Sequence, residues 1–107
     1  MNQKLIYEEL SNNVSKSTTN LYSTSFSLGI LLFKPNIRKD IYSIYGFVRL
    51  ADEIVDTFYD YEPKYLLKDF WLQTLQALEV GISLNPIINS FQETVKEHNI
   101  PSVNRFI

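Results

Sequence analysis

The chain contains no cysteine and a single histidine among its 107 residues. The absence of cysteine excludes a disulfide framework, a thiolate metal site and a cysteine nucleophile. The lone histidine, His98, excludes a metal site built from several imidazoles. We expect His98 at the surface near the end of a helix, where the helix dipole favours positive charge.

The chain also lacks a large net charge of either sign and a long apolar run. Its net charge is −2 and its lysines and arginines are scattered, which gives no electrostatic footprint for nucleic acid. The N-terminus has no uninterrupted apolar region of the signal-peptide kind, and the longest apolar run, residues 30–33, is too short to cross a bilayer. We therefore expect a cytoplasmic chain with no nucleic-acid partner. Peripheral contact with a membrane is left open.

Glycine is rare and no strand-like alternation persists, whereas apolar residues recur at spacings of three and four. These features predict an all-α chain of one domain. The expected helices cover about residues 3–20, 36–59, 64–80 and 86–99, with a break near 22–27 followed by a short apolar segment to 33. Pro35, Pro63 and Pro86 suit helix starts because proline lacks the N–H that would be unpaired there, and Gly81 suits a helix end.

The expected helices over 64–80 and 86–99 each carry an apolar face. We expect these faces to form the core, with Trp71 as a core residue. The positions concerned are Leu67, Phe70, Trp71, Leu75 and Leu78 in the first helix, and Ile87, Ile88, Phe91 and Val95 in the second.

Residues 45–56, Tyr-Gly-Phe-Val-Arg-Leu-Ala-Asp-Glu-Ile-Val-Asp, place charged groups in a helix whose other faces are apolar. At about 100° per residue, Tyr45, Arg49, Asp52 and Asp56 fall within an arc of roughly 60°. Their side chains therefore share one stripe. A helix that is apolar nearly all round is usually buried, so we expect this acidic stripe to face an interior cavity.

The acidic stripe needs a counter-charge. Two carboxylates about 6 Å apart repel by about 3 kcal/mol at an effective dielectric near 20. Arg49 neutralises part of this charge, but Glu53 adds a third acid beside Asp52 and Asp56. Mg²⁺ fits the remainder, because it takes one or two carboxylates together with waters and substrate phosphates. From these residues alone, the alternative is a solvated acidic face with an arginine salt bridge.

Two motifs together carry a family resemblance. The segment Tyr22-Ser-Thr-Ser-Phe-Ser-Leu, followed by the break at Pro35 and then by residues 45–56, resembles the start of the squalene and phytoene synthase family. The resemblance covers approximately residues 14–107. It implies an all-α helical bundle of the isoprenoid synthase type that joins two prenyl diphosphates head to head. It also implies Mg²⁺ held between two aspartate-rich motifs on facing helices.

The resemblance assigns roles to individual residues. Asp52, Glu53 and Asp56 correspond to the first metal-binding motif. Tyr45 and Arg49 line the same cavity wall, with Asp52 and Asp56, as the catalytic group. Ser23 and Ser25 correspond to diphosphate contacts near the kink, and Phe26 to an aromatic wall residue. Taken without the resemblance, the serines could equally cap helices.

Two departures from the family pattern are visible. Thr24 stands where some relatives have a basic residue between the serines, and no second acidic motif occurs in these residues. The chain also ends inside a new apolar-periodic segment, Val103, Phe106 and Ile107. We therefore expect residues 1–107 to be the N-terminal part of one isoprenoid synthase domain, its first four or five helices.

The functional expectation is a Mg²⁺-dependent prenyltransferase acting on farnesyl or geranylgeranyl diphosphate to give a squalene- or phytoene-type product. We expect the 107 residues alone to be inactive, because half of the metal cage is absent from them. Their uncovered apolar faces favour self-association. One alternative is a non-catalytic family member that acts in assembly or partner binding. Another is a plain helical interaction module that matches the family by coincidence.

Overall fold

The computed structural model describes residues 2–98, and this part of the chain is helical with no strand. Its elements are α1 (Gln3–Tyr22), α2 (Thr24–Ile30), α3 (Pro35–Asp56), the short 3-10 helix η1 (Tyr59–Tyr61), α4 (Pro63–Val80) and α5 (Pro86–Glu97). The all-α prediction is therefore confirmed. The predicted end of the last helix at Asn99, and the apolar segment after residue 102, lie outside the described residues.

Local sequence signals fix most helix ends. Ser23 caps α2 and Asn85 caps α5 through their side chains, and Pro35, Pro63 and Pro86 each occupy a first turn, as predicted. Gly81 ends α4 in the left-handed region at φ 92°, which a residue with a Cβ atom rarely adopts.

Helix α3 ends at Asp56, three residues before the predicted end near residue 59. The backbone N–H groups of Thr57 and Phe58 both donate to the Glu53 carbonyl, at 2.8 Å and 3.0 Å. This shared acceptor closes the last turn, and Phe58 then takes a non-helical backbone conformation. Apolar periodicity continues through Phe58 and Tyr59, which is why the sequence overestimates the length of the helix.

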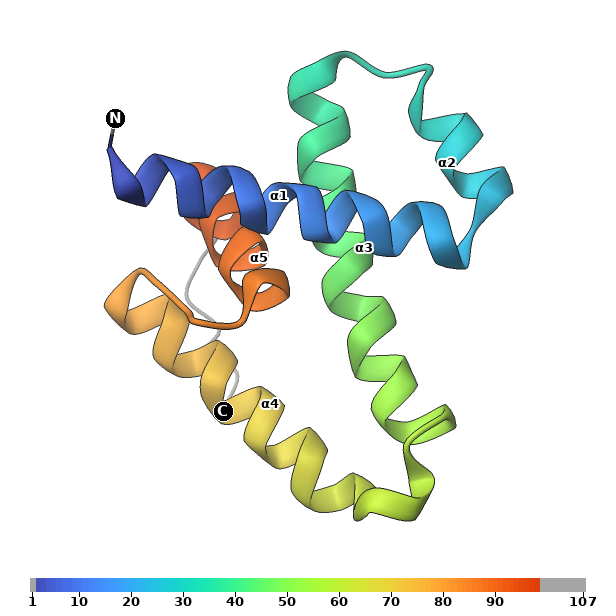
Figure 1. Ribbon diagram of the computed structural model, residues 1–107, viewed down its shortest axis with the longest axis vertical. Coiled ribbons are helices and arrows are strands. Elements are labelled where there is room, and N and C mark those ends of the chain that lie inside the picture. Colours follow the sequence, from blue (N-terminus) through green and yellow to red (C-terminus); the bar gives the residue numbers. More distant parts are fainter. Residues whose placement is uncertain (1, 99–107) are drawn as a thin grey trace.

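Helices α1, α3 and α5 pack on one another and form the centre of the fold. In Figure 1, α1 crosses α3 near the middle of its length, α5 lies beside both, and α4 leads from the far end of α3 back towards α5. Helix α2 turns back from the end of α1 and leads into α3. None of the described helices has the length and apolar character needed to cross a membrane.

Small polar side chains fill the contact between α1, α3 and α5. The Ser15 and Ser90 hydroxyls hydrogen-bond to each other, and the Ser43 and Thr94 hydroxyls do so at 2.5 Å. We call this set the polar seam, and its buried members are Ser11, Ser15, Thr19, Ser43, Asn89, Ser90 and Thr94. Its hydrogen bonds meet the needs of these buried hydroxyls. The seam has no signal in the sequence, because serine and threonine in a helix are typical of a solvated face.

The apolar core lies between α3, α4 and α5, around Ile54, Phe70, Ala77 and Ile88. The Phe47 ring stacks on Phe91, with centroids 3.9 Å apart. The prediction that Trp71 lies in the core is wrong, since 39% of its surface is exposed. Helix α4 packs through the line of Phe70, Thr74 and Ala77, which turns Leu67 and Trp71 to the edge of the contact.

Gly46 allows α1 to approach α3 closely. A Cβ atom at Gly46 would lie 3.3 Å from Ser15 Cα and Cβ and from Ile87 Cδ1, whereas one at Gly29 would meet nothing within 4 Å. We expect Gly46→Ala to lower the free energy of unfolding by about 1–3 kcal/mol through overpacking. The matched change Gly29→Ala should raise it by about 0.5–1 kcal/mol. Urea unfolding followed by circular dichroism measures both, and equal effects would contradict the close-approach account.

Candidate active site

The acidic stripe lies on the C-terminal half of α3, with Arg49 at its centre. The Arg49 Nη2 atom lies 3.0 Å from Glu53 Oε1. The same nitrogen lies 3.9 Å from an oxygen of Asp52 and 3.9 Å from an oxygen of Asp56. Three carboxylates therefore surround one guanidinium group, as the shared helix face requires.

The three carboxylates around Arg49 differ in burial. The Glu53 side chain is 13% exposed, whereas Asp52 is 55% and Asp56 is 68% exposed. The prediction that the whole stripe faces an interior cavity is therefore wrong for the two aspartates in the part of the chain that the structure describes. Helix α1 crosses α3 nearer to the N-terminal end of α3. No described helix therefore covers the side of the last turns of α3 that carries Asp52 and Asp56.

Both carboxylate oxygens of Glu53 have partners. Oε1 accepts from Arg49, and Oε2 accepts from the Thr57 hydroxyl. This arrangement fixes the guanidinium against α3. The role of Glu53 as a metal ligand stays a prediction, whereas the oxygens of Asp52 and Asp56 are open to solvent.

The segment around the break after α1 reaches the stripe through two aromatic contacts. The Phe26 and Tyr45 rings stack with centroids 5.0 Å apart, and the Arg49 Cζ atom lies 5.3 Å from the centre of the Tyr22 ring. The structure thus brings the two motifs of the sequence analysis together. Tyr22 was not predicted as a site residue, because its position depends on the geometry of the break rather than on helical spacing.

An apolar pocket of about 290 Å³ lies beside the stripe, between α2 and α3. Its lining is entirely apolar in surface, and it shares the stacked pair Phe26 and Tyr45 with the aromatic contact described above. The residues around it are Phe26, Ile41, Ile44, Tyr45 and Val48. Charged groups and an apolar pocket therefore meet at Tyr45.

The serines near the break have different surroundings. Ser23 Oγ accepts from the Phe26 backbone N–H at 3.1 Å and so caps α2. Ser25 is exposed in the first turn of α2. Ser27 Oγ is buried with no hydrogen-bond partner among the described residues. The alternative that these serines cap helices is therefore confirmed for Ser23. Its oxygen accepts a hydrogen bond, so its hydroxyl hydrogen is still available to a ligand.

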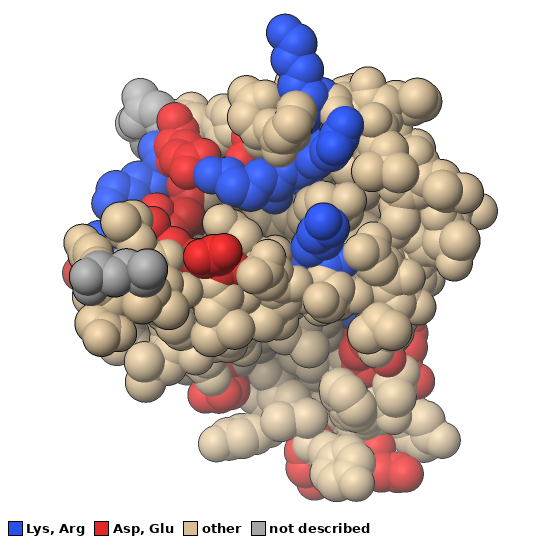
Figure 2. All heavy atoms as spheres, turned by 45° about the horizontal axis from the view of Figure 1, so that its top comes forward, with Lys and Arg blue, Asp and Glu red and all other residues tan. Residues whose placement is uncertain are grey.

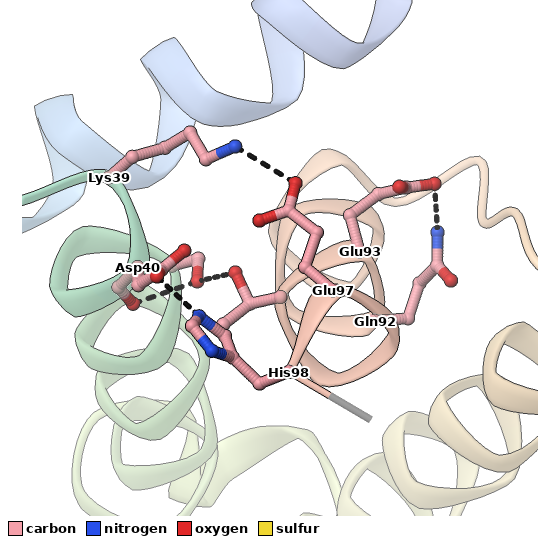
Figure 3. Close-up of polar contacts among 8 residues, drawn as sticks. Lys39, Asp40, Gln92, Glu93, Glu97 and His98 are labelled. Atoms are coloured by element: carbon pink, nitrogen blue, oxygen red, sulfur yellow. Dashed lines mark hydrogen bonds and ion pairs between the residues drawn. The ribbon is translucent and has the colours of Figure 1, made fainter. Parts of the chain in front are cut away.

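A second group of ionisable side chains joins α3 to the end of α5 (Figure 3). His98 Nε2 lies 2.5 Å from Asp40 Oδ2, and Lys39 Nζ lies 3.0 Å from Glu97 Oε1. His98 is exposed at the C-cap of α5, as predicted. Oxygen and nitrogen atoms of Asp40, Glu97 and His98 lie within 4.8 Å of one another. No sequence signal predicts this cluster, because Asp40 and His98 are separated by 58 residues.

The different burial of the stripe carboxylates predicts different effects on stability. Replacing Glu53 by Gln should lower the free energy of unfolding by about 1–2 kcal/mol, because a charged partner of the part-buried Arg49 is lost. Asp52→Asn and Asp56→Asn should each change it by less than about 0.5 kcal/mol, as exposed positions do. Urea unfolding of the three variants tests this order. An aspartate variant as costly as Glu53→Gln would contradict it.

A comparison with protein families places these motifs in a known group. The family model described as squalene/phytoene synthase matches residues 19–104, which include the Ser23–Phe26 segment and the whole acidic stripe. Comparisons with curated proteins and with solved structures found no match. The match covers most of the chain, and the all-α structure agrees with it. The chain belongs to the squalene/phytoene synthase family.

Proposed function

We propose that this chain works in prenyl transfer, as part of an enzyme that joins two prenyl diphosphates head to head. The substrates are farnesyl or geranylgeranyl diphosphate, and the product is a squalene- or phytoene-type precursor in isoprenoid, carotenoid or terpenoid biosynthesis. One observation carries the proposal: Asp52 and Asp56 flank Arg49 on the same helix as Tyr45, which lies one turn before Arg49 and lines an apolar pocket. A prenyl diphosphate has the same division into a charged head and an apolar chain.

The aspartates fit a magnesium ion. Asp52 and Asp56 offer exposed carboxylate oxygens on one face of α3, and Mg²⁺ takes one or two carboxylates while it keeps waters and substrate phosphates as further ligands. When bound, Mg²⁺ supplies positive charge that stabilises a departing pyrophosphate. We assign Asp52 and Asp56 to this ion as ligands. Glu53 is the predicted third acid, and its carboxylate contacts Arg49.

Arg49 binds the diphosphate directly. Its guanidinium is oriented by Glu53 on one side and by the Tyr22 ring on the other. A planar guanidinium fixed in this way donates to phosphate oxygens with little loss of side-chain freedom. Ser23 and Ser25, at the start of α2, add hydroxyl donors to the same head group.

The apolar pocket receives the prenyl chain next to the reacting carbon. Phe26 and Tyr45 present a stacked aromatic wall there. Aromatic faces attract a positive carbon by about 0.5–2 kcal/mol each, and the apolar side chains around the pocket offer a carbocation no nucleophile. Tyr45 therefore links the diphosphate end to the chain end of the site.

The 107 residues contain one aspartate-rich motif, whereas the chemistry proposed for the family needs two on facing helices. We therefore expect diphosphate binding but no turnover by these residues alone. Product analysis after incubation with farnesyl or geranylgeranyl diphosphate and Mg²⁺ tests the second half of this expectation. Sustained turnover would contradict it.

Binding of farnesyl diphosphate tests the assignment of the aspartates. We expect Mg²⁺-dependent binding, measured by isothermal titration calorimetry, to weaken at least about tenfold in the double variant Asp52→Asn/Asp56→Asn. Loss of a group that only supports a metal ligand already costs about 10- to 100-fold in metal affinity, and the two aspartates are assigned as the ligands themselves. The double variant Asp60→Asn/Asp69→Asn makes the same change in net charge at exposed positions outside the stripe and should bind like the parent chain. Addition of EDTA should abolish the parent's binding.

The alternative of a non-catalytic family member gives the opposite result. A protein that keeps the helices only for assembly has no use for the exposed carboxylates of Asp52 and Asp56. Such a chain would bind farnesyl diphosphate weakly or not at all. Its weak binding would be the same in both double variants and in the presence of EDTA.

A further inference from the structure

The turn between α2 and α3 exposes a set of large apolar side chains. Leu32 at its apex is 89% exposed, and Leu31 and Phe33 on either side are also exposed. Leu28 and Ile37, in the flanking helices, are exposed as well. We call residues 31–33 the apolar tip. A contiguous apolar surface of this kind marks an interaction site rather than ordinary exposure of single side chains.

Most backbone polar groups of the apolar tip are paired within the part of the protein that the structure describes, all but the Leu32 carbonyl. The N–H groups of Leu31, Leu32 and Phe33 donate to the carbonyls of residues 28, 29 and 30, at 3.3, 3.1 and 3.0 Å. Arg38 donates through Nε to the Phe33 carbonyl at 2.6 Å and through Nη2 to the Leu31 carbonyl at 3.1 Å. Pairing of most of its backbone groups lowers the cost of moving this turn out of water into a lipid interface, where the remaining carbonyl can still meet head groups and water.

The charge next to the tip is positive. No acidic residue occurs between Glu9 and Asp40, whereas Lys34 and Arg38 directly follow the tip. Figure 2, which brings the top of Figure 1 forward, shows lysine and arginine side chains over the upper part of this face, with acidic side chains beside them on the left and further ones along the lower edge. The chain carries a net charge of −2, so this basic region is a local property of one end of the molecule.

We propose that the α2–α3 turn docks on the surface of an anionic lipid bilayer. The apolar tip enters the boundary between head groups and acyl chains, and Lys34 and Arg38 contact the lipid phosphates. This combination of apolar and basic side chains is the pattern of interfacial membrane anchors. If the proposed function also holds, the contact keeps the apolar pocket between α2 and α3 close to the membrane in which prenyl chains dissolve.

Flotation of the 107-residue chain with vesicles tests the proposal without substrate or Mg²⁺, so its outcome does not depend on the proposed function. We expect binding to vesicles of 30% phosphatidylserine in phosphatidylcholine and much weaker binding to phosphatidylcholine alone. Leu32→Ser should weaken binding to the anionic vesicles about tenfold. Leu84→Ser makes the same change at a position 93% exposed in the α4–α5 connection and should have no effect.

A second pair of matched variants tests the contribution of the basic residues. Lys34 precedes the proline that opens α3, and Lys64 follows the proline that opens α4. Lys34→Gln should weaken vesicle binding about fivefold, with the difference disappearing at high salt, whereas Lys64→Gln should leave it unchanged. Circular dichroism checks that the variants keep the helical content of the parent.

A depth measurement keeps the proposal testable if a variant folds poorly. Trp71 on α4 is the only tryptophan of the chain and lies away from the tip. Brominated lipids should not quench Trp71 in the parent chain but should quench the tryptophan of Leu32→Trp/Trp71→Phe. The proposal is overturned if neither protein binds anionic vesicles, if Leu84→Ser and Leu32→Ser have equal effects, or if Leu32→Ser changes only self-association in light scattering.

Discussion

Helices α1, α3 and α5 meet at Gly46, and the spacing at this contact positions the rest of the structure. Ser15 of α1 and Ile87 of α5 both come within 3.3 Å of the place where a Cβ atom would lie. At this separation only small side chains fit between the helices, so serine and threonine fill the polar seam and satisfy one another's hydroxyls. The seam therefore replaces an apolar core at the centre, while α4 builds an apolar core further along α3.

The same contact determines where the candidate site can form. Because α1 crosses α3 near Gly46, its end at Tyr22 reaches Arg49, one turn further along α3. The short helix α2 then returns along α3 and sets Phe26 on Tyr45. Two sequence motifs separated by the Pro35 break are thus brought together by a helix crossing that involves neither motif. A larger side chain at Gly46 would therefore shift α1 and with it Tyr22, which contacts Arg49 at the site.

What could be predicted from the sequence was local, and what could not depended on the packing partner. The starts at Pro35, Pro63 and Pro86 and the end at Gly81 follow from backbone chemistry of single residues. The order of side chains along the acidic stripe follows from helical periodicity. On α4 the core prediction is confirmed for Phe70 and wrong for Leu67 and Trp71, because all three are apolar and only the position of α3 and α5 decides which of them is buried. The burial of Ser15 and the contact of Asp40 with His98 have no local signal at all.

Arg49 neutralises part of the negative charge of the acidic stripe. Each aspartate oxygen at 3.9 Å from Arg49 gains between about 1 kcal/mol in water and about 4 kcal/mol at an effective dielectric of 20. Exposure of Asp52 and Asp56 puts the value near the lower end, which is enough to offset the repulsion between them. Glu53, at 3.0 Å and mostly buried, holds the guanidinium more tightly than either aspartate does. The two tasks are therefore divided: Glu53 keeps Arg49 in place, and Asp52 and Asp56 keep oxygens free for a further ligand.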